Sequence, residues 1–288
     1  MKIANLVLNF VKKIRFIFLI LIASIYSESG AQVLIGPVVN GNVGWPVYKN
    51  ADVKEGLDVK PALGYNFGAS LSFRVQKRFF LQTSILYSRK VKHIEEESSK
   101  FQYDASFKNI LKLNYIEMPI LYTAEFKGKL GEKSNKEFKW YLGAGPTISY
   151  WLGGKGHLSD GDLIEANVGT LDYRVVFNKD PEDVKMGEMN VSDPNRIQLA
   201  LNLSAGLILE PVGFNKIMVA VRYEFGHSFL SGDSDGYFGG LDNDLFYQDE
   251  LQHRMHTLNL SLQYFIDLKT DQKNKGKSTI KTKKGKIR

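Results

Sequence analysis

The sequence predicts an all-β protein, an eight-stranded antiparallel transmembrane up-and-down β-barrel with four long external loops. Three observations predict it. Apolar and polar side chains alternate over segments of about ten to sixteen residues, the polar positions hold mostly small side chains, and the connections between segments are alternately long and short. Because successive side chains of a strand point to opposite faces, this alternation indicates strands with one apolar and one polar face.

The first element is a predicted secretory signal peptide, residues 1–31. A basic stretch that ends at Arg15 precedes the apolar run Phe16–Ala23, and small residues around Ala31 suit cleavage before Gln32. The apolar run is too short to cross a hydrocarbon layer of about 30 Å, which disfavours an uncleaved anchor. No cysteine follows it, so a lipoprotein anchor is excluded.

Residues 32–267 are the predicted barrel, and their alternating segments give eight strands in chain order. The segments are Val33–Trp45, Ala62–Arg74, Phe79–Val91, Leu113–Phe126, Phe138–Leu152, Arg196–Glu210, Lys216–Gly226 and Thr257–Ile266. In the clearest of them the apolar face holds Ile197, Leu199, Leu201, Leu203, Ala205, Leu207 and Leu209. Seven residues extend ~24 Å at 3.4 Å per residue, close to the ~25 Å apolar band of a membrane barrel.

The opposite faces hold mainly Gly, Ser, Asn, Thr and Gln, which fit a crowded, hydrated lumen. A soluble sandwich would more often carry Lys and Glu there, although alternation alone permits one. The predicted long links are Pro46–Pro61, Lys92–Lys112, Gly153–Asn195 and Leu230–Gln252, and they alternate with shorter ones. Long loops outside and short turns in the periplasm are typical of outer-membrane barrels.

The last element, residues 268–288, is predicted to be a basic, disordered periplasmic tail. The chain carries +7 in total; residues 1–31 contribute +3 and residues 271–288 contribute +7, which leaves −3 for the body between them. The body therefore lacks the basic surface of a nucleic-acid-binding domain. The tail is interpreted as a solvated segment, with an acidic partner, peptidoglycan or anionic lipid as the alternative.

Three segments, in order along the chain, are similar to strands of a known family. Leu81–Lys90, Leu113–Tyr122 and Gly143–Leu152 resemble strands of the PorT-like outer-membrane β-barrel proteins of Bacteroidota. The resemblance covers roughly residues 32–267. The resemblance implies an outer-membrane barrel. The member after which the family is named is needed for type IX secretion and gliding.

Five charged residues fall on the predicted lumen face, namely Arg74, Glu117, Glu125, Arg222 and Glu224. Charges in a narrow barrel must pair, because an unpaired one loses its hydration without compensation. We expect a structural ion-pair network that fills and rigidifies the lumen. A proton or ion path is the alternative, but eight strands leave an interior just filled by side chains.

No cofactor, catalytic residue or metal site is predicted. The chain has no cysteine, so thiolate sites are excluded, and the spacing of His253 and His256 puts them on opposite faces of a strand. The acidic loop 231–250 could offer oxygens to Ca²⁺ from Asp233, Asp235, Asp242 and Asp244, but it lacks the EF-hand spacing. A solvated loop is therefore preferred, and the segment Asp172–Phe177 of the longest link is expected to form an external hairpin.

The function that follows is a non-enzymatic outer-membrane barrel with a structural or interaction role, accessory to type IX secretion if the resemblance extends that far. Its predicted partners are outer-membrane lipid and envelope secretion or surface proteins, with no nucleic acid. The alternatives are a barrel hydrolase or acyltransferase, which needs a rim cluster around a histidine, and a small porin-like channel. A soluble secreted sandwich is the remaining alternative.

Overall fold

The structure is a computed structural model that describes residues 33–49, 57–96, 107–129, 137–160, 163, 169–210, 215–232, 235–239 and 249–268. The predicted signal peptide and the tail beyond Leu268 lie outside these residues, as do the side chains of the four aspartates considered for Ca²⁺. No helix in the described ranges is long and apolar enough to cross a membrane.

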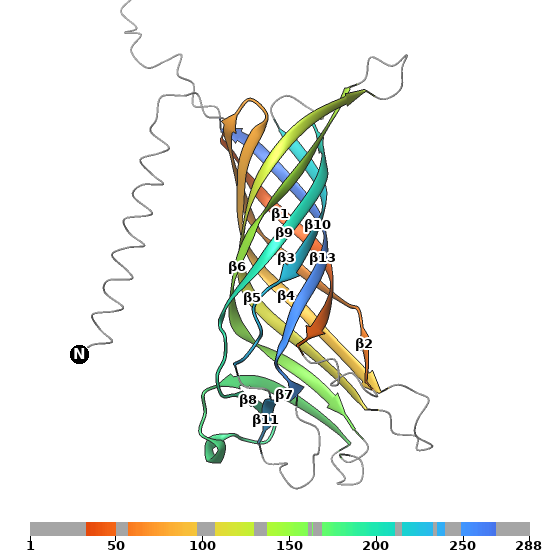
Figure 1. Ribbon diagram of the computed structural model, residues 1–288, viewed down its shortest axis with the longest axis vertical. Helices are drawn as coiled ribbons and strands as arrows, with labels where there is room; N and C mark the ends of the chain where they lie inside the picture. The colour runs from red at the N-terminus through yellow and green to blue at the C-terminus, as the bar shows by residue number, and fades with distance from the viewer. Residues whose placement is uncertain are drawn as a thin grey trace, which may run out of the picture.

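Eight long strands form the wall of the molecule (Figure 1). They are β1 (Val33–Tyr48), β3 (Ala62–Gln76), β4 (Phe79–Glu96), β5 (Lys108–Lys129), β6 (Glu137–Ser159), β9 (Ile197–Leu209), β10 (Lys216–Gly226) and β13 (His253–Leu268). Each pairs antiparallel with the next in this order. The last strand, β13, pairs with β1 from Val33–Leu268 to Tyr48–His253, so the sheet closes and leaves no free edge. The predicted eight-stranded antiparallel barrel is confirmed.

Apolar side chains cover the outside of this wall. On β9 the seven residues of the predicted apolar face include six large side chains that are 48–59% exposed. On β5 the outward positions from Ile116 to Phe126 are apolar or aromatic over ten residues, roughly 34 Å along the strand at 3.4 Å per residue. At a strand tilt of about 40° the band is roughly 26 Å high, the thickness that a lipid bilayer requires.

The two ends of the barrel differ. Short connections join β3 to β4, β5 to β6 and β9 to β10 at one end, and the long connections lie at the other, which is the external end. The strands β4, β5 and β6 extend five to seven residues farther into the long links than the predicted bounds Val91, Leu113 and Leu152. The predicted links Lys92–Lys112 and Gly153–Asn195 were therefore too long.

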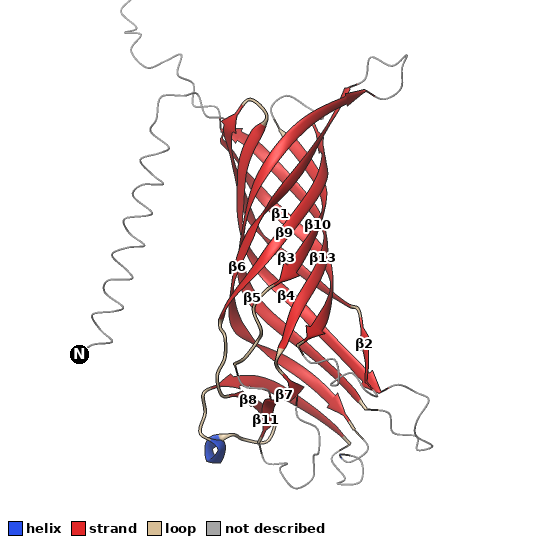
Figure 2. Ribbon diagram, viewed as in Figure 1, coloured by secondary structure: helices blue, strands red, loops and turns tan. Residues whose placement is uncertain are grey.

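Short strands at the external end add a lobe to the barrel (Figure 2). They are β7 (Thr170–Phe177), β8 (Glu188–Val191), β11 (Asp235–Phe238) and β12 (Asp249–Glu250). A further short strand, β2 (Leu57–Lys60), pairs with the external end of β4. The strand β7 pairs antiparallel with the end of β6 and contains the predicted hairpin segment. The strand β8 pairs parallel with β7, and β11 joins β8 to β12. A helical turn, Pro181–Asp183, also belongs to this lobe.

The lobe has an apolar core that fills the external mouth of the barrel. Trp151, Leu111, Met189 and Leu251 are fully buried in it. The ring of Phe177 packs edge-on against Trp151, with centroids 4.8 Å apart. Side chains from β5, β6, β7 and β8 thus meet over the lumen, which they cover.

Along β5 the alternation keeps its phase but inverts its polarity. From Glu117 to Thr123 the inward side chains include polar ones and the outward ones are apolar, whereas at Leu111 and Leu113 the inward side chains are apolar and fully buried. The outward residue between them is the exposed Lys112. The inversion follows from the surroundings, because lipid covers the outside of the barrel and water covers the outside of the lobe.

Pro119 on β5 and Pro146 on β6 lie inside strands without shifting the register of the ladder between them. The ladder of β5 and β6 is interrupted between Pro119–Thr147 and Tyr122–Ala144, next to Pro146, yet the register on both sides is the same. Each proline removes one donor, but the pairs on either side hold the register. The register shifts instead at Asn114/Tyr115, opposite Gly153, where the barrel wall becomes the lobe.

Candidate functional site

The lumen is occupied by a buried group of charged side chains, which we call the charge cluster: Lys90, Glu117, Arg222 and Glu224. The ammonium of Lys90 lies 2.6 Å from Glu117 and 2.5 Å from Glu224. Arg222 interacts electrostatically with both carboxylates. All four residues are at most 7% exposed. Two cations and two anions make the cluster formally neutral, which satisfies the requirement that buried charges be paired.

Asparagine side chains join the charge cluster to the barrel wall. Asn66 donates from Nδ2 to Glu117 at 3.3 Å and to Asn259 at 3.4 Å, and it accepts a hydrogen bond from Asn42. The ring of Tyr115 lies 5.2 Å from the ammonium of Lys90. The cluster is therefore held by side chains from β1, β3, β4, β5, β10 and β13, around much of the barrel circumference.

A neutral polar layer follows toward the short-turn end. Gln82 donates to Gln263 across the lumen at 2.6 Å, and Ser70 and Ser84 share a hydrogen bond. A cavity of about 20 Å³ lies between this layer and Arg222, with room for about one water molecule. Space of this size is not a channel for solutes.

An apolar layer, which we call the apolar plug, closes the short-turn end. It consists of Leu34, Tyr141, Ile208, Met218, Ala220 and Phe265. On the periplasmic side of the apolar plug, Lys139 binds Glu210 at 2.7 Å and lies 3.9 Å from Glu125. Lys216 lies 3.5 Å from Glu210. The lumen is thus closed by apolar side chains at the periplasmic end and by the lobe core at the external end.

A buried polar contact, which we call the external latch, joins the barrel to the lobe. Lys92 donates to Asp249 at 2.7 Å and to the carbonyl oxygen of Glu250 at 3.2 Å. Asn109 donates to the same Asp249 oxygen at 3.3 Å and accepts from the hydroxyl of Tyr173 at 2.8 Å. Burial and the nearby Asp249 raise the pKa of Tyr173 well above its ordinary value. The latch fixes the segment that precedes β13 across the external mouth.

Glu188, which is 2% exposed, links the strands β7 and β8 of the lobe. It accepts hydrogen bonds from Lys179 and from Arg174, each at 2.6 Å, and from the backbone N–H of Lys185 at 3.1 Å. These donors, Lys179 first, lower the pKa of Glu188 to about 2. It therefore remains ionised well below neutral pH.

One histidine–carboxylate pair lies on the outer face of the lobe. His157 Nδ1 is 2.8 Å from Asp172 Oδ1, and the two side chains are 46% and 88% exposed. Among the described residues no hydroxyl group is hydrogen-bonded to this imidazole. No group of three possible metal ligands occurs in the described ranges either.

The predicted lumen residues separate into two groups. Glu117, Arg222 and Glu224 belong to the charge cluster. Glu125 lies at the periplasmic rim, 3.9 Å from Lys139. Arg74 is exposed at the end of β3, where its guanidinium lies 5.1 Å from the ring centre of Phe80. Arg74 and Glu125 point to the lumen side of their strands, but they lie too near the periplasmic end to reach the other three.

The sequence interpretation missed the two lysines on which the buried contacts depend. Lys90 and Lys92 alternate in phase with the inward residues Gln82, Ser84 and Ser88 of β4, which was the available signal. Asp249 gave no such signal, because it lies in a long connection whose path depends on the tertiary fold.

A comparison with protein families agrees with this architecture. The model of the family described as "Outer membrane protein beta-barrel domain" matches residues 29–228, more than half of the chain. No curated protein matches the sequence.

Among solved structures, Neisserial surface protein A is 11% identical with a TM-score of 0.35, over 83% of this chain and 99% of that one. OprG from Pseudomonas aeruginosa is 11% identical with a TM-score of 0.35, over 83% and 94%. Ail, the attachment invasion locus protein of Yersinia pestis, is 10% identical with a TM-score of 0.30, over 81% and 98%.

Proposed function

Because the chain belongs to the outer membrane protein β-barrel domain family, we propose that it is a non-conducting barrel that presents its external lobe for interaction at the cell surface. The observation that carries this proposal is the filled lumen. Three successive layers occupy it: the neutral charge cluster, the Gln82–Gln263 layer and the apolar plug. The lobe core and the external latch cover its mouth. A pore for solutes would need these side chains to move apart together.

A bilayer recording tests the closed lumen directly. The purified full chain is inserted into a planar bilayer and recorded beside a general porin that shows the assay detects open barrels. We expect no stable conductance steps from this protein. Discrete, long-lived steps would contradict the proposal and support the porin-like alternative.

An interaction role accessory to type IX secretion is the finer form of the proposal. Its support is the resemblance of Leu81–Lys90, Leu113–Tyr122 and Gly143–Leu152 to PorT-like strands, together with the external lobe of β7, β8, β11 and β12, which offers a surface to a partner. The test is deletion of the gene followed by measurement of type IX cargo in the culture medium. We expect secretion to fall and to return when the gene is restored. Unchanged secretion would contradict this finer role while leaving the closed barrel in place.

We propose no enzymatic activity. A barrel hydrolase needs a nucleophile or an activated water held beside its general base. Asp172 is the one hydrogen-bonding side chain that His157 contacts in the described part of the chain, and both are open to solvent. Hydrolysis of a broad peptide or ester substrate panel that is lost in His157→Ala, but not in the exposed control His227→Ala, would contradict this proposal.

A further inference from the structure

Above the lipid-facing band, the outer wall carries three exposed cations in one cross-strand line, which we call the basic row. Lys112 on β5 pairs with Lys155 on β6, and Lys155 pairs with Arg174 on β7. Their neighbours Leu111, Leu113, Tyr173 and Val175 point inward and are buried, so all three cations point outward. From the basic row we propose that this wall binds the phosphate groups of the glycolipid in the outer leaflet, the lipid A portion of lipopolysaccharide.

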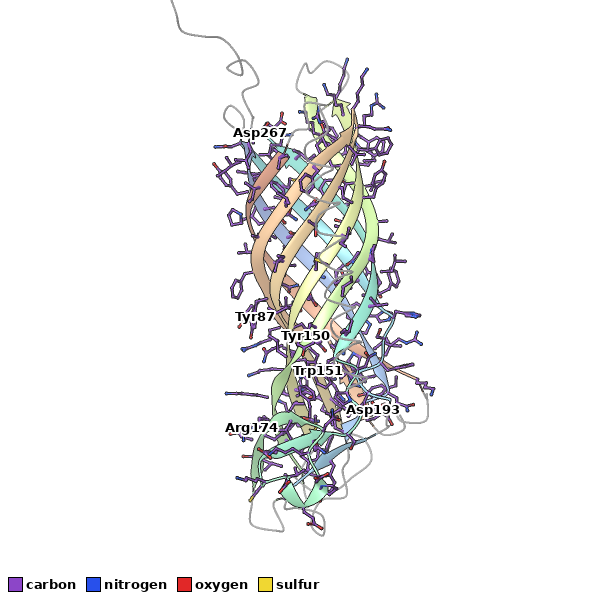
Figure 3. The ribbon with its side chains drawn as sticks, turned by 90° about the vertical axis from the view of Figure 1, so that its left-hand side faces the viewer. Tyr87, Tyr150, Trp151, Arg174, Asp193 and Asp267 are labelled. Carbon is purple, nitrogen blue, oxygen red and sulfur yellow. The ribbon has the colours of Figure 1, made fainter. Side chains whose placement is uncertain are left out.

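The height of the basic row agrees with such a ligand. A line of paired apolar and aromatic residues, Phe67, Tyr87, Ile116, Tyr150 and Ile197, crosses the wall. On β4 and β5 its members are the last outward apolar residues before Arg89 and Asn114, so they lie at the external edge of the lipid-facing band there. Aromatic side chains of this kind mark the boundary between hydrocarbon and headgroups. Lys112 is four residues beyond Ile116, which places it roughly 10 Å farther out for a strand tilted by about 40°. Figure 3 shows Arg174 on the same wall, closer to the external loops than Tyr87 and Tyr150.

The charges of the basic row are not balanced by the protein. In the described part of the chain, neither Lys112 nor Lys155 forms an ion pair. The two lysines lie directly opposite one another on β5 and β6, so their like charges repel. Arg174 and Lys179 both bind the carboxylate of Glu188. Two positive charges therefore share one negative charge, which leaves a net charge of +1 at this position. The exposed Asp172 lies two residues from Arg174 on β7, farther from the lipid-facing band, and pairs with His157. An anion outside the wall would relieve the repulsion between the two lysines.

The wall between the basic row and the lipid-facing band leaves space for a headgroup. Asn114, two residues from Lys112, lies opposite Gly153, which has no side chain to cover the surface. A methyl group at Gly153 would have one neighbour within 4 Å, a backbone oxygen at 3.9 Å. Beside it, Arg89 donates to Asn114 at 3.0 Å, and its guanidinium lies 5.4 Å from the ring centre of Tyr65. A fourth cation therefore borders this open position, between the aromatic line and the basic row.

The test compares two forms of one lipid on three forms of the full chain. The probes are bisphosphorylated lipid A and the same lipid with its phosphates removed, and binding to the detergent-solubilised protein is measured by native mass spectrometry. The wild type should bind the phosphorylated form about tenfold or more tightly, because charge-assisted contacts to phosphate are strong. Lys112→Gln/Lys155→Gln should lose this preference.

Lys77→Gln/Arg78→Gln is the matched control, since it removes two exposed cations from the short turn at the opposite end. This control should retain the wild-type preference. Equal affinity of the wild type for both lipids, or equal loss in both double variants, would overturn the proposal. Complete displacement of the lipid by millimolar inorganic phosphate would also overturn it, because the ligand would then be free phosphate. None of these outcomes depends on whether the lumen conducts.

Discussion

The ammonium of Lys92 lies 2.7 Å from a carboxylate oxygen of Asp249, and both side chains are fully buried. The two residues are 157 positions apart in the chain. Lys92 belongs to the barrel wall and Asp249 to the segment that enters β13, so this contact ties an external connection to the rigid sheet. The segment that covers the external mouth is therefore held to the barrel wall by a buried ion pair.

Replacing Lys92 with Met should open the external latch. The change leaves Asp249 buried without its ammonium partner, which costs about 3–5 kcal/mol when one member of a buried pair is removed. Amide hydrogens of Asp249–His253 should exchange faster, while the middle of β13 stays protected. Lys108→Met, an exposed lysine on β5, is the control. Lys92→Met/Asp249→Leu should recover much of the protection, and unchanged exchange in Lys92→Met would show that the latch does not hold this segment.

Lys90→Met should destabilise the whole barrel. It leaves Glu117 and Glu224 buried with Arg222 as the remaining cation of the charge cluster, at a cost of about 3–5 kcal/mol. The temperature at which the compact band is lost in an SDS gel should fall. Lys139→Met at the partly exposed rim should change it little, since such pairs contribute about 1 kcal/mol or less. Equal midpoints for the two variants would contradict a stabilising role for the cluster.

The lobe should loosen in acid because of Glu188. The pKa of Glu188 is lowered from 4.5 to about 2 by Lys179, Arg174 and the Lys185 amide. A carboxylate with a lowered pKa stabilises the fold above its unfolded-state pKa, and this contribution is lost as the pH falls from about 4.5 toward 2. Pepsin cleavage within residues 170–191 should therefore increase over this range.

A matched pair of variants checks that assignment. Glu188→Gln should be cleaved more readily already at pH 5 and should show less change with pH. Glu182→Gln, a change at an exposed position of the same lobe, should behave as the wild type. If the acid dependence of cleavage were the same in Glu188→Gln as in the wild type, another group would have to account for it.

Two glycines of β1 should respond differently to alanine. A methyl group at Gly36 would overlap the backbone carbonyl of Tyr264 on β13, whereas at Gly41 it would meet no atom within 4 Å. Gly36→Ala should therefore strain the pairing that closes the barrel, by about 1–3 kcal/mol, and Gly41→Ala should be nearly neutral. Urea unfolding in micelles measures both. Similar unfolding midpoints would show that β13 can shift without cost.

Much of the barrel was determined by the sequence alone, because membrane strands are described by local rules. Side chains alternate with a period of two, lipid selects apolar residues on one face, and closure is needed since lipid cannot satisfy a free edge. These rules located the eight strands, their lipid-facing sides and the lumen side of Glu117, Arg222 and Glu224. Even the change from barrel to lobe was present in β5, as the inversion of polarity between Leu113 and Ile116.

Which side chains meet was decided by the tertiary structure. The stagger of the closed sheet determines the height of each inward residue, so Lys90 contacts Glu117 and Glu224 while Arg74, on the same side of its own strand, remains at the rim. Asp249 reaches Lys92 through a connection without a strand pattern of its own. The line of Lys112, Lys155 and Arg174 likewise exists only once β5, β6 and β7 are paired in register. Periodicity gives each residue a side of the wall, and pairing gives it its neighbours.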